Sequence, residues 1–359
     1  MQIIERLVPG YERVVICRDE ESGLHAVIAI HDTRRGPGVG GCRMWPFADE
    51  DAALFDALRL SRGMSQKNAV AELPLGGGKS VILGDPARDK SEALLRAFGR
   101  CVESLGGRYI VAEDVGIRVD DIETIALETE YVAGRRGGRA ASGDPSPFTA
   151  QGVHVGLRTA ATRHLSRADL RGLRVAVQGV GSVGMALCER LHADGARLIV
   201  SDPSDARTRE ATERFGAQVV APDAILASEC EVFAPCALGG ILDDRGVATL
   251  RTRVVGGAAN NQLALPRHGD ALAARGILYV PDFVLNAGGI VNVAAELAGN
   301  YDAAAVAAQV DTIAERVDKL LHDAARTGRP THRLALAWAD RKLAEGSPVS
   351  RSARRRATG

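Results

Sequence analysis

The segment Gly179-Val180-Gly181-Ser182-Val183-Gly184 limits the fold of this chain more than any other part of its sequence. It follows an apolar run, Arg174 to Gln178, typical of a buried strand, and it opens a helical pattern that continues to about Ala193. Glycines at these spacings allow a tight turn and let backbone N–H groups approach a pyrophosphate. A strand, a glycine turn and a helix in this order predict an α/β unit that binds a dinucleotide.

The residues after this turn alternate between strand-like and helix-like patterns. Such alternation is typical of βαβ units, which form a parallel Rossmann sheet with helices on both faces. A final helical region is expected from Asp302 to about Ala325. The other expected elements are a strand at 197–201, a helix at 207–215, and short strands near Val219, Val232 and Val254 and at 277–280.

Asp202 lies at the end of the second expected strand, about 20 residues after the glycine turn. A carboxylate there is expected to bind the adenosine ribose hydroxyls and to repel a 2′-phosphate. This position predicts NAD as the cofactor in preference to NADP, although Arg207 nearby counts against that preference.

Composition excludes several other classes of protein. The chain has 359 residues, enough for two domains, and its 45 basic residues balance 45 acidic ones. Small molecules are therefore expected as partners, with no nucleic acid and no membrane. We find no secretory signal and no apolar run of membrane length, so a cytoplasmic location is expected. The cysteines have no metal-site spacing, so we expect reduced thiols and no metal at Cys17, Cys42, Cys101, Cys188, Cys230 and Cys236.

The first half begins with strand-like runs at 13–17 and 24–30, then a glycine-rich stretch at 36–41 that brings bare backbone close to another segment. Acidic residues from Asp49 open a helix that ends near Lys67. The later run Leu75 to Ser80 resembles a nucleotide-triphosphate loop, but that motif requires glycine at Leu73 and a helix afterwards. Lys79 therefore needs another role.

The expected domains are a substrate-binding, catalytic and oligomerisation domain at 1–138, a Rossmann domain at 139–330, and a C-terminal helix with a basic tail at 331–359 that partly packs back on the first domain. A hinge is expected at Gly134 to Pro147, where glycine, proline and polar residues gather, and an active cleft is expected between the two domains.

Lys67, Lys79 and Asp114 are each unremarkable alone, because lysines are usually solvated and an aspartate before Val-Gly usually caps a turn. Together with other ordered blocks they resemble the Glu/Leu/Phe/Val amino-acid dehydrogenases, most of all the leucine, valine and phenylalanine branch. The blocks are Gly40-Gly41-Cys42-Arg43-Met44, Arg62-Gly63-Met64-Ser65-Gln66-Lys67, Leu75 to Ser80, Ala112-Glu113-Asp114-Val115, Gly143-Asp144-Pro145-Ser146-Pro147, Phe233-Ala234-Pro235-Cys236-Ala237, Gly257-Ala258-Ala259-Asn260-Asn261-Gln262 and Asn286-Ala287-Gly288-Gly289.

The resemblance implies an α/β fold, a homo-oligomer and a role for each matched residue. Lys67 is expected to bind the substrate carboxylate, Lys79 to act as the catalytic lysine, and Asp114 to assist proton transfer. Further substrate contacts are implied at Gly40, Gly41, Met64 and Asn261, and cofactor contacts at Gly179, Val180, Gly181, Ser182, Val183, Gly184, Asp202, Asn260 and Asn286.

These roles suit reversible, NAD-dependent oxidative deamination of an L-amino acid to its 2-oxo acid and ammonia. The reaction must hold a carboxylate, remove hydride from Cα and activate water. A lysine serves as the base near neutral pH when burial and a like charge, here expected from Lys67, lower its pKa to roughly 7 to 8.

The expected side-chain pocket is apolar, because the resemblance maps it onto Val39, Ala112, Ile290 and Val293. Relatives specific for glutamate carry a lysine where this chain has Val39. We therefore expect leucine, valine or isoleucine as substrate, and an aromatic amino acid, phenylalanine or tryptophan, as the alternative. A catalytically silent dinucleotide sensor is the alternative from another class, but it would have no use for Lys67, Lys79 and Asp114.

Overall fold

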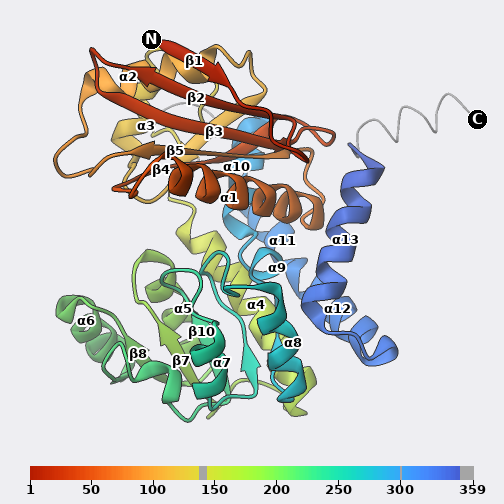
Figure 1. The fold of residues 1–359 in the computed structure, drawn as a ribbon. Coiled ribbons are helices and arrows are strands. Elements are labelled where there is room, and N and C mark those ends of the chain that lie inside the picture. Colours follow the sequence, from red (N-terminus) through yellow and green to blue (C-terminus); the bar gives the residue numbers. More distant parts are fainter. Residues whose placement is uncertain (137–143, 300, 348–359) are drawn as a thin grey trace, which may run out of the picture. The chain divides into compact units, whose positions relative to one another are not determined.

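The computed structural model describes residues 1–136, 144–299 and 301–347, which belong to two compact units (Figure 1). The first unit contains residues 1–143, 293–301 and 339–359, and the second contains 144–292 and 302–338. Residues 137–143 of the expected hinge lie outside the described residues. The basic tail, within 348–359, lies outside them entirely. The domain boundaries expected from the sequence stay a prediction.

The first unit holds a mixed sheet in the order β1-β2-β3-β5-β4-β6, in which β1, β2, β3 and β5 pair antiparallel and β4 pairs parallel with β5 and β6. Its strands and helices are β1(Gln2–Glu5), β2(Arg13–Asp19), β3(Leu24–Asp32), β4(Gly38–Trp45), α1(Glu50–Val70), β5(Gly76–Leu83), α2(Glu92–Glu103), β6(Tyr109–Glu113) and α3(Val119–Ile125).

Alternation along the strands gives this sheet two apolar faces. Val14 and Val27 pack with Ala53 and Ala57 of α1, whereas Val15 and other residues of opposite parity pack with α2 and α3. Figure 1 shows α1 on one face and α2 with α3 on the other. Helix α1 begins where the acidic run predicts, since the Asp49 side chain accepts a hydrogen bond from the Ala52 backbone N–H (2.8 Å).

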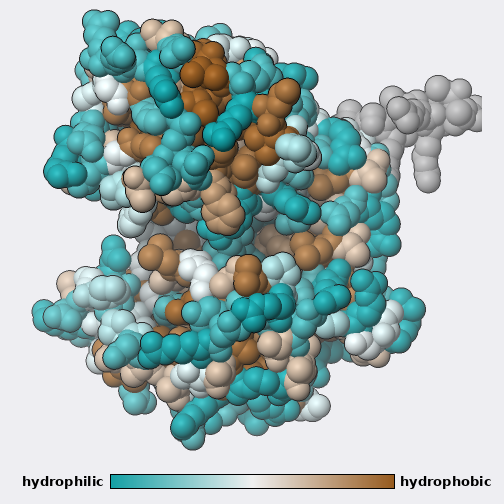
Figure 2. Space-filling view, viewed as in Figure 1, coloured by the Kyte–Doolittle hydropathy of each residue, from teal (hydrophilic) through white to brown (hydrophobic). Residues whose placement is uncertain are grey.

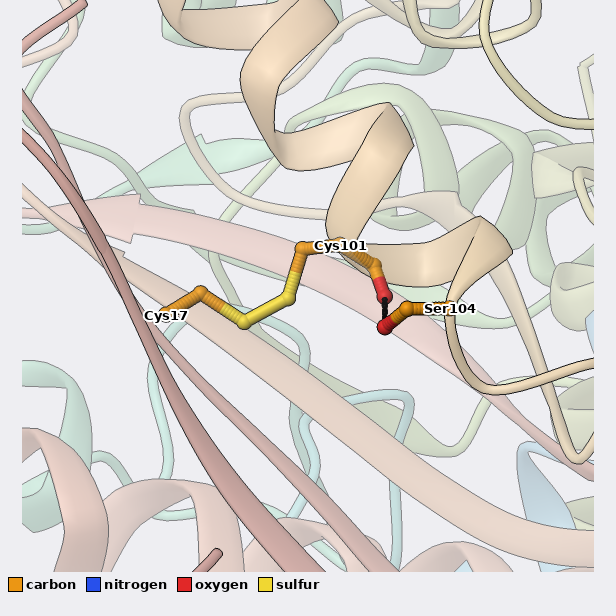
Figure 3. Close-up of a disulfide and its surroundings, with 3 residues drawn as sticks. All are labelled: Cys17, Cys101 and Ser104. Carbon is orange, nitrogen blue, oxygen red and sulfur yellow. Dashed lines mark hydrogen bonds between the residues drawn. A yellow bond between two sulfur atoms is a disulfide. The ribbon is translucent and has the colours of Figure 1, made fainter. Parts of the chain in front are cut away.

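The expectation that all thiols are reduced is wrong for one pair. Cys17 on β2 and Cys101 on α2 form a disulfide, with Cα atoms 6.6 Å apart (Figure 3). Both side chains are completely buried, where α2 crosses the sheet. The two residues are 84 positions apart, so no local spacing signals the pair. Cys42, Cys188, Cys230 and Cys236 are free.

We expect four reactive thiols per chain when the protein is unfolded without reductant, and six after reduction. The count follows because a disulfide blocks both of its sulfurs until it is reduced. Titration with a chromogenic thiol reagent in denaturant measures it. Six thiols before reduction would mean that Cys17 and Cys101 are unbridged in solution.

The second unit holds a parallel sheet in the order β9-β8-β7-β10-β11-β12, the strand order of a doubly wound dinucleotide fold. It confirms the predicted α/β class. Its elements are α4(Ser146–Leu165), β7(Arg174–Gln178), α5(Ser182–Ala193), β8(Arg197–Ser201), α6(Asp205–Phe215), β9(Gln218–Val219), η1(Ile225–Ala227), β10(Val232–Pro235), α7(Asp244–Thr249), β11(Val254–Val255), α8(Pro266–Ala274), β12(Leu278–Tyr279), α9(Asp282–Leu285), α11(Ala303–Asp311) and α12(Ile313–Thr327), with α10(Gly288–Leu297) and α13(Thr331–Glu345) shared between the units.

The long helix expected from Asp302 is interrupted at Thr312, between α11 and α12. The Thr312 hydroxyl donates to the Gln309 carbonyl (2.6 Å), a local bond that competes with the regular helical pattern. The apolar stripe is confirmed, because Val306, Val310 and Ile313 are buried on both sides of the break.

The end of α13 is anchored within the first unit by Arg35. This buried guanidinium donates to the backbone carbonyls of Leu73 (3.1 Å), Lys342 (3.1 Å) and Gly346 (2.9 Å). Within the described ranges we find no helix long and apolar enough to span a membrane. Figure 2 shows hydrophobic patches among hydrophilic side chains on the unit that carries β1 and β2. The exposed large apolar side chains of the first unit include Ile3, Leu7, Trp45 and Phe55.

Candidate functional site

Lys79, one of the two predicted catalytic residues, lies on β5, and the other, Asp114, directly follows β6. The parallel strand β4 lies between β5 and β6. Gly41 is paired with Ala112, and Cys42 is paired with both Ser80 and Glu113. Since side chains alternate across a sheet, Lys79, Gly41 and Asp114 share the face that α1 packs against, while Ser80, Cys42 and Tyr109 belong to the other face.

Lys79 and Asp114 form an ion pair, with Lys79 Nζ donating to Asp114 Oδ2. The strand between them carries Gly41, and its lack of a side chain leaves room for the pair. A Cβ at Gly41 would lie 2.7 Å from Asp114 Cβ and 2.5 Å from the Glu113 carbonyl oxygen. The close backbone approach predicted for the glycine-rich stretch is therefore confirmed at this position, and also at Gly40, where a Cβ would overlap the Gly78 carbonyl.

The electrostatics of the site favour an ionised Asp114. Burial by itself raises the pKa of this carboxyl, but the charges of Lys79 and Arg43 outweigh burial, so the pKa lies below its ordinary value. Lys79 is itself buried. Its Nζ bonds the Asp114 carboxylate. The like charge expected from Lys67 stays a prediction.

Tyr109 supports these strands from the other face, and the sequence did not single it out. Its hydroxyl donates to the Gly40 carbonyl (2.8 Å) and bonds the Ser80 hydroxyl (2.9 Å), so one side chain ties β6 to both β4 and β5. Burial raises the pKa of Tyr109 well above its ordinary value, so it remains a neutral phenol. Its ring occupies the space that a side chain at Gly78 would need.

Lys67 and Met64 lie near the C-terminal end of α1, and both are partly exposed. The helix approaches β5 closely at Gly77, where a Cβ would collide with the backbone of Ser65. The Asn68 side chain adds a hydrogen bond to the Gly76 carbonyl (2.5 Å). These contacts hold the last turns of α1, which carry Lys67, against the strand that carries Lys79.

The glycine fingerprint connects β7 to α5 in the second unit, as predicted. Gly179 has a φ of 88°, in the left-handed region that favours glycine, and a Cβ there would press on Ala237. Gly184 packs on the Gly179 carbonyl with no room for a side chain. Val180 is buried. Helix α5 begins at Ser182, followed by Val183, so the backbone N–H groups of its first turn are available to bind a phosphate.

Asp202 lies at the end of β8, beside this turn. Its carboxylate accepts hydrogen bonds from the backbone N–H groups of Val180 (3.0 Å) and Ser204 (2.9 Å), and Arg207 Nη1 is 3.8 Å away. The side chain of Asp202 is only 6% exposed, whereas that of Arg207 is 57% exposed. The carboxylate is thus held rigidly, and the arginine is the more accessible of the two charges.

The predicted asparagines lie together in the second unit. Asn286 Nδ2 donates to Asn260 Oδ1 (2.9 Å) and to the Ala258 carbonyl (3.0 Å). Asn261 has a φ of 51°, and its backbone N–H donates to Asp282 (2.5 Å). Asn260 and Asn261 lie on the loop after β11, and Asn286 ends α9, the short helix after β12. Both segments follow the carboxyl ends of strands, where doubly wound folds bind ligands.

The four residues expected to line an apolar pocket lie on three elements. Val39 and Ala112 are on β4 and β6, on the face that carries Lys79, and Val39 is fully buried. Ile290 and Val293 are one helical turn apart on α10 and are both nearly buried.

Within the part of the chain that the structure describes, no group of three or more histidine, cysteine, aspartate or glutamate side chains is arranged to hold a metal.

Comparison with known proteins agrees with this geometry. The family model described as Glu/Leu/Phe/Val dehydrogenase, dimerisation domain, matches residues 11–131, and the model described as Glutamate/Leucine/Phenylalanine/Valine dehydrogenase matches residues 204–345. A leucine dehydrogenase from Geobacillus stearothermophilus is 49% identical over 344 residues, 96% of this chain and 92% of the relative. A valine dehydrogenase from Streptomyces coelicolor is 46% identical over 342 residues, 94% of each chain.

Among solved structures, L-tryptophan dehydrogenase from Nostoc punctiforme superposes with a TM-score of 0.78 at 42% identity, covering 94% of this chain and 96% of that one. Matches of this extent confirm the resemblance seen in the sequence. The chain therefore belongs to the Glu/Leu/Phe/Val dehydrogenase family and is an oxidoreductase that acts on the CH–NH2 group of an amino acid.

Proposed function

We propose that this enzyme catalyses the reversible, NAD-dependent oxidative deamination of leucine, valine and isoleucine to their 2-oxo acids and ammonia. The observation that carries the proposal is the Lys79–Asp114 pair beside Gly41, on the sheet face that also carries the apolar Val39 and Ala112. Names of the leucine and valine dehydrogenases among its relatives support the choice of substrate.

Each charged residue then has a chemical task. Lys67 binds the substrate carboxylate. The Asp114 carboxylate accepts a proton from the substrate ammonium, because only the neutral amine can support loss of hydride from Cα. NAD, held by the glycine turn at residues 179–184 and by Asp202, would supply the hydride acceptor, and loss of hydride leaves Cα as an iminium carbon. Lys79, as a neutral amine, removes a proton from the water that attacks this carbon. Asp114 then returns its proton to the amine nitrogen and takes up the hydroxyl proton as the C–N bond breaks, which leaves the carbonyl group and ammonia.

A panel of L-amino acids tests the choice of substrate. We expect NADH formation at alkaline pH with leucine, valine and isoleucine and none above background with glutamate, because Val39 offers no cation to a side-chain carboxylate. The rates with these three amino acids are expected to be similar, because one methylene group changes the transition-state binding free energy by only about 1 to 3 kcal/mol. Faster oxidation of phenylalanine or tryptophan would assign the pocket to an aromatic side chain, a possibility that the tryptophan dehydrogenase relative supports.

NAD is proposed over NADP because the Asp202 carboxylate lies beside the fingerprint turn. Arg207 weakens this preference, because its guanidinium lies 3.8 Å from the carboxylate. Replacing Arg207 with alanine is expected to lower kcat/KM for NADP about tenfold, since an ion pair near a surface is worth about 1 to 4 kcal/mol, with little change for NAD. An equal loss with both cofactors would show that Arg207 contacts a group that they share.

A homo-oligomer is also proposed, on the ground that residues 11–131 match a dimerisation domain. Sedimentation of the full chain measures its state. The cytoplasmic location expected from the sequence stays a proposal. The Cys17–Cys101 disulfide is unusual for that compartment, where thiols are kept reduced.

A further inference from the structure

Arg43 lies between two carboxylates at the edge of the site. Its Nη1 donates to Asp56 Oδ2 (2.8 Å), and its Nε lies 3.4 Å from Asp114 Oδ2. Arg43 is on β4, two positions after Gly41, so its side chain projects from the same face as Lys79 and Asp114. The sequence blocks include Arg43, but the roles inferred from them do not use it.

The far end of this arginine is held firmly. Asp56 lies on α1 and is buried, and its other oxygen accepts a hydrogen bond from Arg59 (2.8 Å). A charged hydrogen bond to a buried carboxylate restrains the guanidinium plane, because the planar group has little freedom once one nitrogen is bonded. The chain from Arg59 to Asp56 to Arg43 therefore directs the Arg43 Nε toward Asp114.

The Arg43 Nε is buried and makes no hydrogen bond to any residue that the structure describes. It lies 3.4 Å from Asp114 Oδ2, which is already bonded to Lys79. A buried donor without a partner costs about 1 to 3 kcal/mol, so a modest rotation of the carboxylate that completes this bond is favourable. Lys79 can activate water only after it leaves Asp114, and that step makes the carboxylate available to Arg43.

We propose that Arg43 is a positioning residue that holds Asp114 aligned and ionised, ready to accept the proton of the substrate ammonium, once Lys79 turns from Asp114 to the substrate. The proposal rests on the proposed function. It assigns Arg43 no contact with the substrate, because its action passes through Asp114.

The charges around Asp114 support this role. Lys79 faces it from β5 and Arg43 from β4, and the Asp114 charge also acts on Cys42 of β4 and Tyr109 of β6. Asp56 and Arg59 of α1 act on Asp114 through Arg43. Burial raises the pKa of the Cys42 thiol to about 12, so this residue stays neutral. Arg43 is therefore the cation that keeps the pKa of Asp114 low when Lys79 moves away.

The test is the pH profile of kcat/KM for Arg43→Met and Arg43→Lys. Removing a cation favours the protonated carboxyl, so the acidic limb of the Arg43→Met profile is expected to move to higher pH by about one unit, with about a tenfold loss of kcat/KM at neutral pH. Arg43→Lys keeps the positive charge but lacks the planar guanidinium group. It is expected to return the acidic limb of the profile to near its original position. If kcat/KM falls by the same factor at every pH in both variants, the proposal is overturned.

Arg18→Met is the matched control. Arg18 also links a strand to α1 through a carboxylate, bonding Glu50 at 2.5 Å, but it lies on β2, outside the catalytic and binding residues. Its pH profile is expected to match that of the unmodified enzyme.

A measurement that needs no turnover separates this proposal from the proposed function. Arg43→Met is expected to lower the melting temperature less in an Asp114→Asn background than in the original chain, because the amide no longer needs a neighbouring cation. If Arg43→Met lowers the melting temperature equally in the two backgrounds, Arg43 and Asp114 are uncoupled. If the enzyme oxidises no amino acid, the proposed function fails, and this cycle still decides whether Arg43 stabilises an ionised Asp114.

Discussion

Replacement of Lys79 with alanine is expected to lower kcat for the preferred amino acid by about 10²- to 10⁴-fold, the usual contribution of a general base. The side chain is buried and contacts Asp114, and we find no other lysine, among the residues that the structure describes, bonded to that carboxylate. The substitution removes the proposed base and also leaves Asp114 with Arg43 as its remaining cationic partner.

NAD binding separates a catalytic effect from a general loss of structure. The glycine turn at residues 179–184 lies in the second unit, in a different sheet from Lys79, so cofactor affinity measured by fluorescence is expected to stay within about twofold. Lys90→Ala is the matched control, since it removes another lysine–aspartate pair, with Asp121 at 2.7 Å, away from the site. Near-normal turnover in Lys79→Ala would exclude this residue from the mechanism.

Substitution of Gly41 with alanine is expected to lower kcat/KM about hundredfold without unfolding the protein. The new methyl group would lie 2.7 Å from Asp114 Cβ and 2.5 Å from the Glu113 carbonyl, so the end of β6 must shift by several tenths of an ångström. A displacement of about 1 Å at a catalytic group costs about 10²-fold in rate. Steady-state kinetics and the melting temperature, measured together, test this prediction.

The control for Gly41→Ala is Gly106→Ala. Gly106 has a φ of 58° and open space around its missing side chain, so alanine there costs roughly 1 kcal/mol of stability through backbone strain and leaves turnover unchanged. If Gly41→Ala retains full activity, the close approach of β4 and β6 is not needed to place Asp114.

The glycine fingerprint was predictable because all of its parts are local. A strand, a turn and a helix form from consecutive residues, and each glycine serves a contact within that unit, such as Gly184 against the Gly179 carbonyl. Helix α1 was predictable for the same reason, since its N-cap at Asp49 and its apolar face follow from neighbouring residues. By contrast, the break at Thr312 coincides with a side-chain bond to Gln309, which periodicity does not reveal.

Residues far apart in the chain were harder to place. The family resemblance named Lys79 and Asp114, but their direct contact depends on the strand order β5-β4-β6 and on the missing side chain at Gly41. Tyr109 had no sequence signal, because a buried tyrosine looks like any core residue until its hydroxyl is seen to join three strands.

The sequence by itself determined the local elements, the family and the residue types available for chemistry, because periodicity, caps and glycine turns act between neighbours in the chain. Only the tertiary structure decided which charges meet. Asp114 is paired with Lys79 and approached by Arg43, and Cys17 is bridged to Cys101, through the pairing of strands and the packing of helices on them. Electrostatic and covalent contacts depend on distances of a few ångströms, and the folded sheet sets those distances between residues that are remote in sequence.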